Sequence, residues 1–490
     1  MKDMIISPQY LWDGMSDNVS GSQAVLIQDG VIRKVGGKEQ LMGMCPSAEI
    51  RENSDWLLMP AFVDAHDHGR GMSPVSFGAP DRALEMWLQD LNKLPAIPHY
   101  TACYYDGIRL ASCGVGTVLH SHNPNDFSMI KEEMVSTAKG YKDAGVRSIL
   151  CPLYLDQNKR IYYDRDQFIA GLPKPLKSKF KVGICDQIMN IDEYLTLVGE
   201  IRDALKEDIE SGWTEIQLHP NGGQWCSDAA LLHMKEYAIS HNMHIHLHLL
   251  ETQYQAEYAR RTWGKSFIKH YQEIGFLGPW VSFAHAVWLD EEDLQLISAS
   301  GARLVTNPSS NLRLRSGTFN MRRASELGLF CGIGLDGCAF DDDQDYLREI
   351  RVAWLNNRHN GVDGDVDYLN VLKMATSKGA TIAASNLTPG VIEKGRNADF
   401  VCISLNSIIK PYADSDLDPL ALLVQRATRG SVDMTFINGV QTWGKTENFR
   451  QKEAEAEKQI CDVIKKLRES DPDKRDNSVL LSHVHDFYAR

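Results

Sequence analysis

The sequence lacks the features of membrane proteins and of nucleic-acid-binding proteins. No apolar run is long enough to span a bilayer, and the first residues show no charged segment followed by a long apolar one. Lys and Arg number 52 against 65 Asp and Glu, which gives a formal net charge of −13. Because phosphate binding needs clustered basic residues, this balance argues against nucleic acid as a partner.

Paired cysteines are also missing. Ten cysteines are scattered along the chain, without a Cys-x-x-Cys pair or a regular spacing. Small buried thiols in a reducing compartment explain this pattern better than disulfides do. We therefore expect a cytoplasmic protein.

What the sequence does contain is a long alternation of strand-like and helix-like segments. The 490 residues, 43% of them hydrophobic, suffice for a large core and more than one domain. Between residues 59 and 385, about eight strand–helix units predict an α/β fold, a (β/α)₈ barrel of the TIM type with insertions. The strand-like runs after the first are 116–122, 146–154, 181–185, 214–219, 244–250, 280–285, 302–306 and 330–336.

Both ends of the chain have β character. Asp29-Gly30 and Asn438-Gly439 each join two apolar runs, a pattern typical of hairpins. We expect residues 1–58 and 386–446 to pair into one small composite β-sandwich domain beside the barrel.

A helix and tail are expected over 447–490. An apolar seam on this helix leaves open whether it packs on its own chain or on a second subunit. The seam consists of Ile460, Val463, Ile464 and Leu467.

The segment Pro60-Ala-Phe-Val-Asp-Ala-His-Asp-His68 ends an apolar run with two histidines. Residues i and i+2 of a strand point the same way, so His66 and His68 can reach one metal ion. A lone His-x-His is a weak signal, because two polar residues at the end of a strand give the same pattern without binding a metal. The ends of later strands decide between these interpretations.

Polar residues at three further strand ends complete a metal site. His248 follows the run around Ile245 and offers a third imidazole, and Asp336 offers a carboxylate. Three imidazoles and one carboxylate hold one divalent ion with a position open for water. Glu251 is placed to move a proton from that water to a leaving nitrogen, and His285 is placed to polarise the substrate.

These motifs resemble the amidohydrolase superfamily, and within it the aminohydrolase branch that includes triazine hydrolases, guanine deaminase and adenosine-type deaminases. The matching segments are PAFVDAHDH, HLHLLET, FAHAVWLDEED, VTNPSSNLRLRSG, GIGLDG and TPGVIEKGRNADFV. The resemblance implies metal ligands at His66, His68, His248 and Asp336, with Asp336 also catalytic. It further implies a proton shuttle at Glu251, a catalytic histidine at His285 and a substrate contact at His219.

Two departures from the family pattern narrow the expectation. No lysine ends the fourth strand, so the carbamate that bridges two metals in some members is absent, and one ion is expected. Zinc is the favoured metal, with iron as the alternative. Thr306 stands where relatives often have a substrate-contacting histidine. The acidic run from Asp341 to Asp345 is interpreted as the first turn of a helix rather than as a loop that binds a cationic substrate.

Further substrate-binding candidates are Arg70, Trp87, Trp288 and Asn311. Arg70 suits an anionic substrate group as well as a surface carboxylate, and the two tryptophans suit the wall of a pocket. His120 and His122 form a second His-x-His, which we expect to line the pocket rather than to ligate, because the first pair completes the family pattern.

The predicted function is that of a metal-dependent hydrolase that deaminates an amino-substituted nitrogen heterocycle. Hydrolysis of a cyclic amide, of a urea-like bond or of a triazine substituent is the nearest alternative. A catalytically silent relative is less favoured, because such proteins lose metal ligands and none is lost here. The expected partner is a small-molecule substrate, and a homodimer is expected by analogy with relatives.

Overall fold

The computed structural model describes residues 2–157, 161–174, 176–177, 189–337, 342–358, 362, 367–383, 390–470 and 477–489. The strand expected at 181–185 lies outside these residues. Within them, no helix combines the length and the apolar character needed to cross a membrane.

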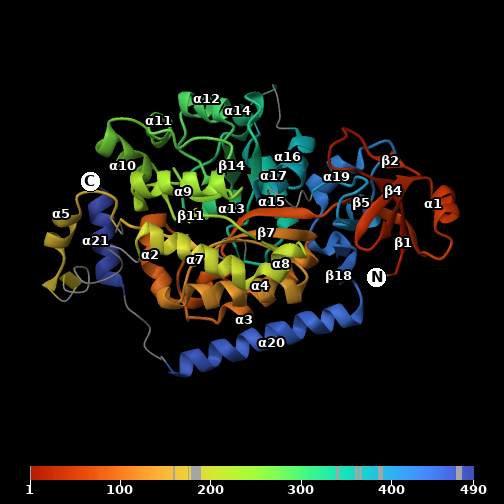
Figure 1. Cartoon of the computed structure of the whole chain (residues 1–490), viewed down its shortest axis with the longest axis horizontal. Helices are drawn as coiled ribbons and strands as arrows, with labels where there is room; N and C mark the ends of the chain where they lie inside the picture. The colour runs from red at the N-terminus through yellow and green to blue at the C-terminus, as the bar shows by residue number, and fades with distance from the viewer. Residues whose placement is uncertain are drawn as a thin grey trace.

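The described parallel strands occupy eight positions of a barrel. This barrel lies at the centre of the molecule (Figure 1). Hydrogen bonding joins β10 to β8, β7 and β6 on one side, β11 to β9, and β12 to β13, β14 and β15 on the other. The strands are β6 (Phe62–Asp67), β7 (Val115–Ser121), β8 (Arg147–Cys151) with its extension β9 (Leu153–Tyr154), β10 (Thr214–Ile216) with its extension β11 (His219–Pro220), β12 (Ile245–Leu249), β13 (Val281–His285), β14 (Arg303–Thr306) and β15 (Cys331–Ile333).

Backbone contacts close this circle. A parallel bridge between Leu218 and Ile245 joins the fourth strand position to the fifth. The Asp336 amide donates to the His66 carbonyl at 2.9 Å and so ties the chain after β15 to β6. The predicted (β/α)₈ barrel is therefore confirmed.

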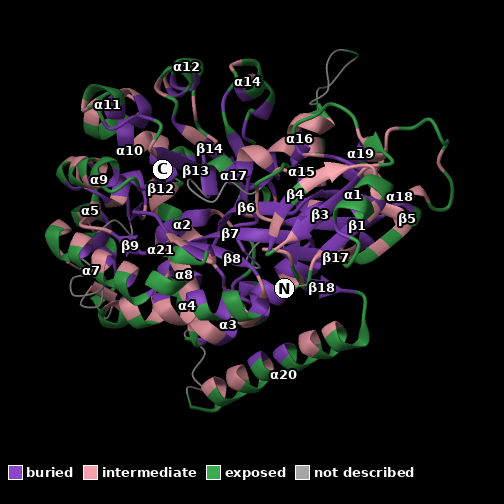
Figure 2. Ribbon diagram, turned by 45° about the vertical axis from the view of Figure 1, so that its right-hand side comes forward, coloured by how far each residue is buried: buried purple, intermediate pink, exposed green. Residues whose placement is uncertain are grey.

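Helices surround the strands, with buried faces inward and exposed faces outward (Figure 2). Those between β6 and β10 are η1 (Pro74–Phe77), α2 (Leu84–Asp90), η2 (Leu91–Lys93), α3 (His99–Ser112), η3 (Phe127–Met129), α4 (Ile130–Ala144), α5 (Arg165–Gly171), α7 (Ile191–Ala204) and α8 (Lys206–Glu210). Those that follow are η4 (Gly223–Trp225), α9 (Asp228–Ser240), α10 (Gln253–Trp263), α11 (Phe267–Glu273), α12 (Glu291–Ser300), α13 (Pro308–Arg313), α14 (Met321–Glu326), α15 (Tyr346–Asn356), α16 (Tyr368–Met374) and α17 (Ser377–Ala383).

Helix α12 illustrates how local sequence sets these boundaries. Asp290 accepts from the Asp293 amide, and the Asp293 carboxylate accepts in return from the Asp290 amide. This reciprocal capping satisfies two amides that have no partner inside the helix. The helix ends at Gly301, whose φ of 74° is costly for residues with a side chain.

Segments from both ends of the chain form one mixed sheet at one end of the molecule (Figure 1). Strand β5 is its centre, because it pairs in parallel with β1 and antiparallel with β16. The elements are β1 (Met4–Leu11), β2 (Ser20–Gly21), β3 (Ala24–Gln28), β4 (Val31–Gly36), α1 (Lys38–Met44), β5 (Glu49–Pro60), β16 (Phe400–Ser404), α18 (Leu405–Ile409), α19 (Pro419–Arg426), η5 (Arg429–Ser431), β17 (Val432–Ile437) and β18 (Val440–Gly444).

The two predicted hairpins flank this sheet. Asp29 and Gly30 have φ values of 52° and 77°, and Asn438 and Gly439 have 51° and 73°. Two consecutive positive φ values match the twist of antiparallel strands. The composite β domain is confirmed as one mixed sheet built from both ends of the chain. Its two hairpin turns lie together, because the Ala398 amide donates to the Gly30 carbonyl and the Gly439 amide donates to the Ala398 carbonyl.

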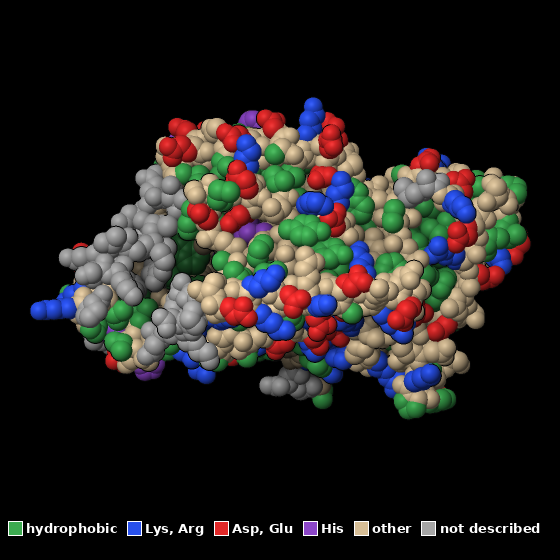
Figure 3. Space-filling model, turned by 90° about the horizontal axis from the view of Figure 1, so that it is seen from below, with side chains coloured by type: hydrophobic (Ala, Val, Ile, Leu, Met, Phe, Trp, Pro, Cys, Tyr) green, Lys and Arg blue, Asp and Glu red, His purple; other side chains and the backbone are tan. Residues whose placement is uncertain are grey.

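The last two helices, α20 (Glu447–Ser470) and α21 (Ser478–Tyr488), leave the sheet and follow the barrel. Helix α20 runs beneath α3 and buries Ile460 against its own chain (Figure 1). Its predicted apolar seam thus packs within the subunit. Acidic and basic side chains intermingle over the face seen from below, where α20 lies (Figure 3).

Candidate active site

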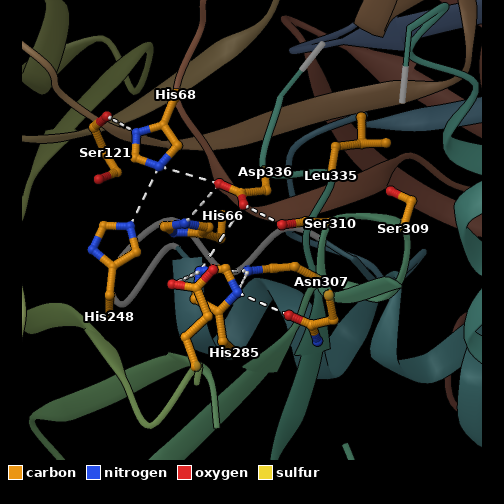
Figure 4. A network of polar contacts seen from close by, with 12 residues as sticks. His66, His68, Ser121, His248, His285, Asn307, Ser309, Ser310, Leu335 and Asp336 are labelled. Atoms are coloured by element: carbon orange, nitrogen blue, oxygen red, sulfur yellow. Dashed lines mark hydrogen bonds and ion pairs between the residues drawn. The ribbon is translucent and has the colours of Figure 1, made fainter. Parts of the chain in front are cut away.

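The barrel gathers the predicted metal ligands at the carboxyl ends of its strands (Figure 4). His66 and His68 lie on or directly after β6, and His248 lies on β12. Asp336 follows β15 by three residues. These four side chains come from three strand positions far apart in the sequence, and they meet in one buried cluster.

Nitrogen and oxygen atoms converge within this cluster. Asp336 Oδ1 lies 3.3 Å from His66 Nε2 and 3.1 Å from His68 Nε2. His248 Nε2 lies 3.3 Å from His68 Nε2. These separations are close to those between neighbouring ligands of one tetrahedral ion with bonds near 2 Å.

Hydrogen bonds outside the cluster fix two of the imidazole rings. His68 Nδ1 donates to the Ser121 carbonyl at 2.8 Å, and His248 Nδ1 donates to the Asn221 carbonyl at 2.5 Å. Burial lowers the pKa of His248 and so favours its neutral form. A neutral imidazole that donates through Nδ1 carries a lone pair on Nε2, which is the atom that a metal requires.

A fourth histidine, His246, orients His66. His66 Nδ1 lies 2.8 Å from His246 Nε2, and His246 Nδ1 lies 2.8 Å from Ser282 Oγ. The Ser282 hydroxyl donates to the Ile245 carbonyl, which makes its oxygen the acceptor for His246. Each proton in this chain of hydrogen bonds then points away from the cluster, and His66 Nε2 carries a lone pair and no proton.

The cluster fits a divalent cation. In the described part of the chain, His66 Nε2 and Asp336 Oδ1 are buried without a hydrogen-bond partner. Bare nitrogens around a carboxylate repel one another unless a cation lies between them. The donor set of imidazole and carboxylate suits zinc and other first-row metals.

Unusual backbone conformations turn these side chains into the barrel mouth. Leu250, His285 and Asp336 have φ values of 50°, 69° and 58°, although none is glycine. Residues with side chains pay strain energy in this region, so the surrounding structure must impose it. All three positions stand where a strand gives way to the loop that carries a predicted catalytic group.

Glu251 enters the site from the loop after β12. Its amide donates to Gln255 Oε1 at 2.9 Å, and its own Oε1 is buried without a hydrogen-bond partner among the described residues. Burial raises its pKa well above the usual value, and the charges of Asp336 and Glu85 add to this. A carboxyl group in this setting holds a proton near neutral pH more readily than an exposed one.

His285 lies opposite Glu251 at the end of β13. Its Nε2 is 3.7 Å from Glu251 Oε2 and 4.0 Å from Asp336 Oδ2. Burial lowers its pKa to about 4, which keeps the ring neutral. Asn307 Nδ2 lies 3.2 Å from His285 Nδ1, and Asn311 Oδ1 lies 3.0 Å from the same atom. Asn311 therefore holds His285, rather than lining the cavity itself.

A cavity of about 70 Å³ lies over the cluster and adjoins a larger one of about 490 Å³. Arg70 lines both cavities and Trp87 lines the smaller one. Arg70 donates to Asn123 Oδ1 at 2.9 Å. Asn221 and Trp225, from the glycine-bearing loop after the fourth strand, also line the smaller cavity. Lining residues that the sequence did not single out are Leu84, Leu88, Leu91, Asn123 and Leu314. The spacing of Leu84, Leu88 and Leu91 along the sequence could have indicated that they share one apolar face of a helix.

Besides Asn311, two further predicted substrate contacts lie apart from this lining, as far as the described residues define it. His219 is fully buried, with Nε2 2.7 Å from Ser121 Oγ and Nδ1 2.6 Å from the His246 carbonyl. Trp288 is 43% exposed and donates through Nε1 to the Ser316 carbonyl.

The acidic run begins a helix where it is described. Asp345 caps α15 by accepting from the Arg348 amide, and it also accepts from the Arg429 amide at 3.0 Å. Asp342 pairs with Arg313 at 3.3 Å. These contacts match the helix-turn interpretation of the run; Asp341 lies outside the described residues.

Comparisons with known proteins agree with this site. Residues 57–442 match the amidohydrolase family. A 5-methylthioadenosine/S-adenosylhomocysteine deaminase of Pyrococcus furiosus is 30% identical over 85% of this chain and 89% of its own length. A 5'-deoxyadenosine deaminase of Methanococcoides burtonii is 28% identical over 84% of this chain and 87% of its own. A zinc-bound adenosine deaminase of Xanthomonas campestris has the same fold, with a TM-score of 0.77, 23% identity, and coverage of 95% and 99%.

The chain belongs to the amidohydrolase family. The prediction of a metal-dependent deaminase from this family is thereby confirmed.

Proposed function

We propose that this enzyme hydrolyses the exocyclic amino group of an adenine nucleoside and releases ammonia. The relatives that match most of its length deaminate 5-methylthioadenosine, S-adenosylhomocysteine or 5'-deoxyadenosine, according to their names. The observation that carries the proposal is the meeting of a metal-type cluster with Glu251 and His285 at the floor of one cavity. In the reaction, water adds to the amino-bearing ring carbon, the carbon–nitrogen bond breaks, and a ring carbonyl remains.

His66, His68, His248 and Asp336 would hold one divalent ion, with zinc as the metal we favour. Such an ion supplies Lewis-acid chemistry, because it lowers the pKa of water towards neutrality. The protein contributes the orientation of its ligands: the Ser121 and Asn221 carbonyls and His246 direct every Nε2 inward.

Glu251 would carry the proton. Its side chain lines the smaller cavity together with the cluster, and its raised pKa allows it to accept a proton from water and to give it to the leaving nitrogen. A proton carrier needs a carboxylate oxygen that is not hydrogen-bonded to another side chain. Glu251 Oε1 has no hydrogen-bond partner within the described structure.

His285 would hydrogen-bond the oxygen that is added to the ring carbon. When Asn307 donates to Nδ1, the proton of the neutral ring lies on Nε2, the atom that faces the cavity floor. The amide of Asn311 presents either its oxygen or its nitrogen to Nδ1 by rotation, so its contact is compatible with this tautomer. Donors already in place at a developing negative charge lower the barrier to its formation.

The cavity walls suit a flat aromatic ring. Trp87, Trp225 and Leu314 are among the apolar groups around the smaller cavity. The ring would occupy this cavity with its amino group towards Glu251, and the sugar with its 5' substituent would extend into the larger one. Arg70 and Asn123 line both cavities and would meet the polar part of the substrate there.

Purified protein of known metal content should be tested with 5'-methylthioadenosine, S-adenosylhomocysteine, 5'-deoxyadenosine and adenosine. Aminopyrimidines, guanine, aminotriazines and cyclic amides complete the panel. Ammonia release, together with the ultraviolet change as the amine becomes a carbonyl, should occur with one or more adenine nucleosides. Ammonia from another ring alone would refute the proposed substrate class, and opening of a cyclic amide without ammonia would refute deamination.

A cytoplasmic homodimer is part of the same proposal and rests on analogy with relatives. Light scattering on the eluted protein gives the mass of the particle in solution, against 55.1 kDa for one chain. A monomer under assay conditions would refute the dimer.

A further inference from the structure

A second group of convergent ligand-type side chains lies beside the active site. His99 is the first residue of α3, His122 follows β7 directly, and Glu133 lies near the start of α4. Glu133 Oε2 is 3.2 Å from His99 Nε2 and 3.1 Å from His122 Nε2. The two ring centres are 4.5 Å apart. The group has no part in the proposed chemistry of the first cluster.

The hydrogen bonds of the neighbouring residues determine which ring nitrogen of His122 carries its proton. The Tyr141 hydroxyl donates its only proton to Asp106 Oδ2 at 3.1 Å. When Asp106 is ionised, Tyr141 therefore acts as acceptor towards His120 Nδ1, which lies 3.3 Å from the same hydroxyl. The proton of neutral His120 is then on Nδ1, and its Nε2 is an acceptor.

The same reasoning continues to the carboxylate. His120 Nε2 lies 3.3 Å from His122 Nδ1, so His122 donates through Nδ1. His120 and His122 are both fully buried, and burial favours the neutral form of an imidazole. A neutral His122 with its proton on Nδ1 has a bare Nε2, and this lone pair faces Glu133 Oε2. His99 Nε2 is also buried without a hydrogen-bond partner among the described residues.

The first cluster shows the same arrangement. There, His68 is fixed by a donor contact at Nδ1, and its bare Nε2 faces Asp336 Oδ1 at 3.1 Å. Lone pairs facing a carboxylate oxygen at this distance repel it unless a cation lies between them.

We propose that His99, His122 and Glu133 form a second divalent-metal site, separate from the catalytic one. Two imidazoles and a glutamate are a ligand set that zinc accepts, with a further position left for water. The carboxylate is held for this role, because its Oε1 accepts from the amides of Asn125 and Asp126 at 3.1 and 3.0 Å.

An ion at this position would stabilise one wall of the larger cavity. The ligands come from α3, from the residue directly after β7 and from α4, and His99 and Asn125 line that cavity. The two sites meet at the end of β7, since Ser121 holds His68 and the next residue is His122. Occupancy would therefore fix the loop after β7, which also carries Asn123.

If these hydrogen bonds run in the opposite direction, the group is stable without a metal ion. This opposite order requires a neutral Asp106 that donates to Tyr141, so that His122 donates through Nε2 to Glu133. Burial raises the pKa of Asp106 well above its usual value, which makes this order a real competitor. The two orders differ in whether the group binds a cation, and metal stoichiometry distinguishes them.

The test uses the full chain, stripped with a chelator and then titrated with Zn²⁺, with bound metal measured by mass spectrometry after dialysis. The wild type should hold two ions per chain. His99→Gln and Glu133→Gln should each hold one, or bind the second ion at least tenfold more weakly. Gln at position 133 keeps an acceptor for the amides of Asn125 and Asp126.

Two controls locate each ion. His248→Gln should also hold one ion, but it should lose the catalytic one, whereas His241→Gln, in an exposed histidine, should still hold two. Thermal unfolding of every variant shows whether it is folded. One ion in the folded wild type, or two ions that persist in both His99→Gln and Glu133→Gln, would overturn the second site. Neither result depends on finding a substrate, so failure here is distinct from failure of the proposed deamination.

Discussion

Glu251 Oε2 and His285 Nε2 lie 3.7 Å apart, and they reach this position from the ends of neighbouring strands β12 and β13. Both residues follow or occupy a backbone position with positive φ, which turns them over the metal-type cluster. Each side chain lines the smaller cavity. The proposed proton carrier and the proposed hydrogen-bond donor thus face the same small volume, as hydrolytic attack on a ring carbon requires.

Glu251→Gln should reduce the rate of ammonia release by about 10²- to 10⁴-fold, which is the usual contribution of a general acid–base group. The amide has nearly the same shape but cannot accept and return a proton. Steady-state kinetics on the best substrate measures the effect. Metal content and thermal stability should match the wild type, and a variant with near-normal activity would remove Glu251 from the mechanism.

His246→Gln should weaken metal binding at the first cluster by about 10- to 100-fold, the effect usual for partners of metal ligands. His246 Nε2 fixes the tautomer of His66, and glutamine restores that contact poorly. Competition with a chelator of known affinity gives the change. His244→Gln, two residues earlier and in contact with Arg303, is the matched control and should bind as the wild type does. Equal metal affinities of the two variants would contradict the role of His246 in orienting His66.

Trp87→Ala should lower kcat/KM by about 10- to 100-fold, mainly through KM, because it removes an apolar wall worth about 1.5 to 3 kcal/mol. Trp87 is 4% exposed and lines the smaller cavity. Trp288→Ala provides the comparison, since this half-exposed ring lies outside the described lining. Initial-rate measurements should separate the two, and a larger loss from Trp288→Ala would contradict this placement of the substrate.

His244 should make folding sensitive to mild acid. Burial lowers its pKa from 6.5 to about 4, and the charge of Arg303 contributes in the same direction. Between these two values, the unfolded chain binds a proton that the folded chain does not. The free energy of unfolding therefore falls as the pH falls through this window, by at most about 3 kcal/mol.

Urea unfolding at pH 7.5 and pH 5 checks this sign. His244→Gln keeps an acceptor for Arg303 and removes the titration, so it should lose less stability than the wild type over the same interval. Loss of metal in acid affects both proteins equally and cancels in the comparison. An equal or larger loss in the variant would show that His244 is not the group that titrates.

The sequence predicted the barrel and the first cluster because both are periodic or local signals. His66 and His68 stand two residues apart at the end of an apolar run, and parallel strands of a barrel all end at the same face. The same rule placed Asp336 and His285 in the site. Glu251 followed from its spacing after His248. These geometric rules need no knowledge of side-chain packing.

The remaining groups could not be predicted, because packing between distant segments places them. His219 ends a strand as the family pattern implies, yet hydrogen bonds to Ser121 and to the His246 carbonyl hold it behind the site. From the sequence, Glu133 is interpreted as an acidic residue in the first turn of a helix, which is the more frequent role of such a residue. Only the fold shows that it faces His99 and His122.

Helix α21 packs against α2, the helix that carries Trp87. Asn477, just before α21, donates to the Gln89 carbonyl at 2.6 Å and exchanges contacts with Asn92. Sequence change near the end of the chain therefore offers a route to new substrate preferences that leaves every ligand of the metal untouched. For the same reason, an affinity tag is better fused to the N-terminus, which lies at the opposite end of the molecule (Figure 1).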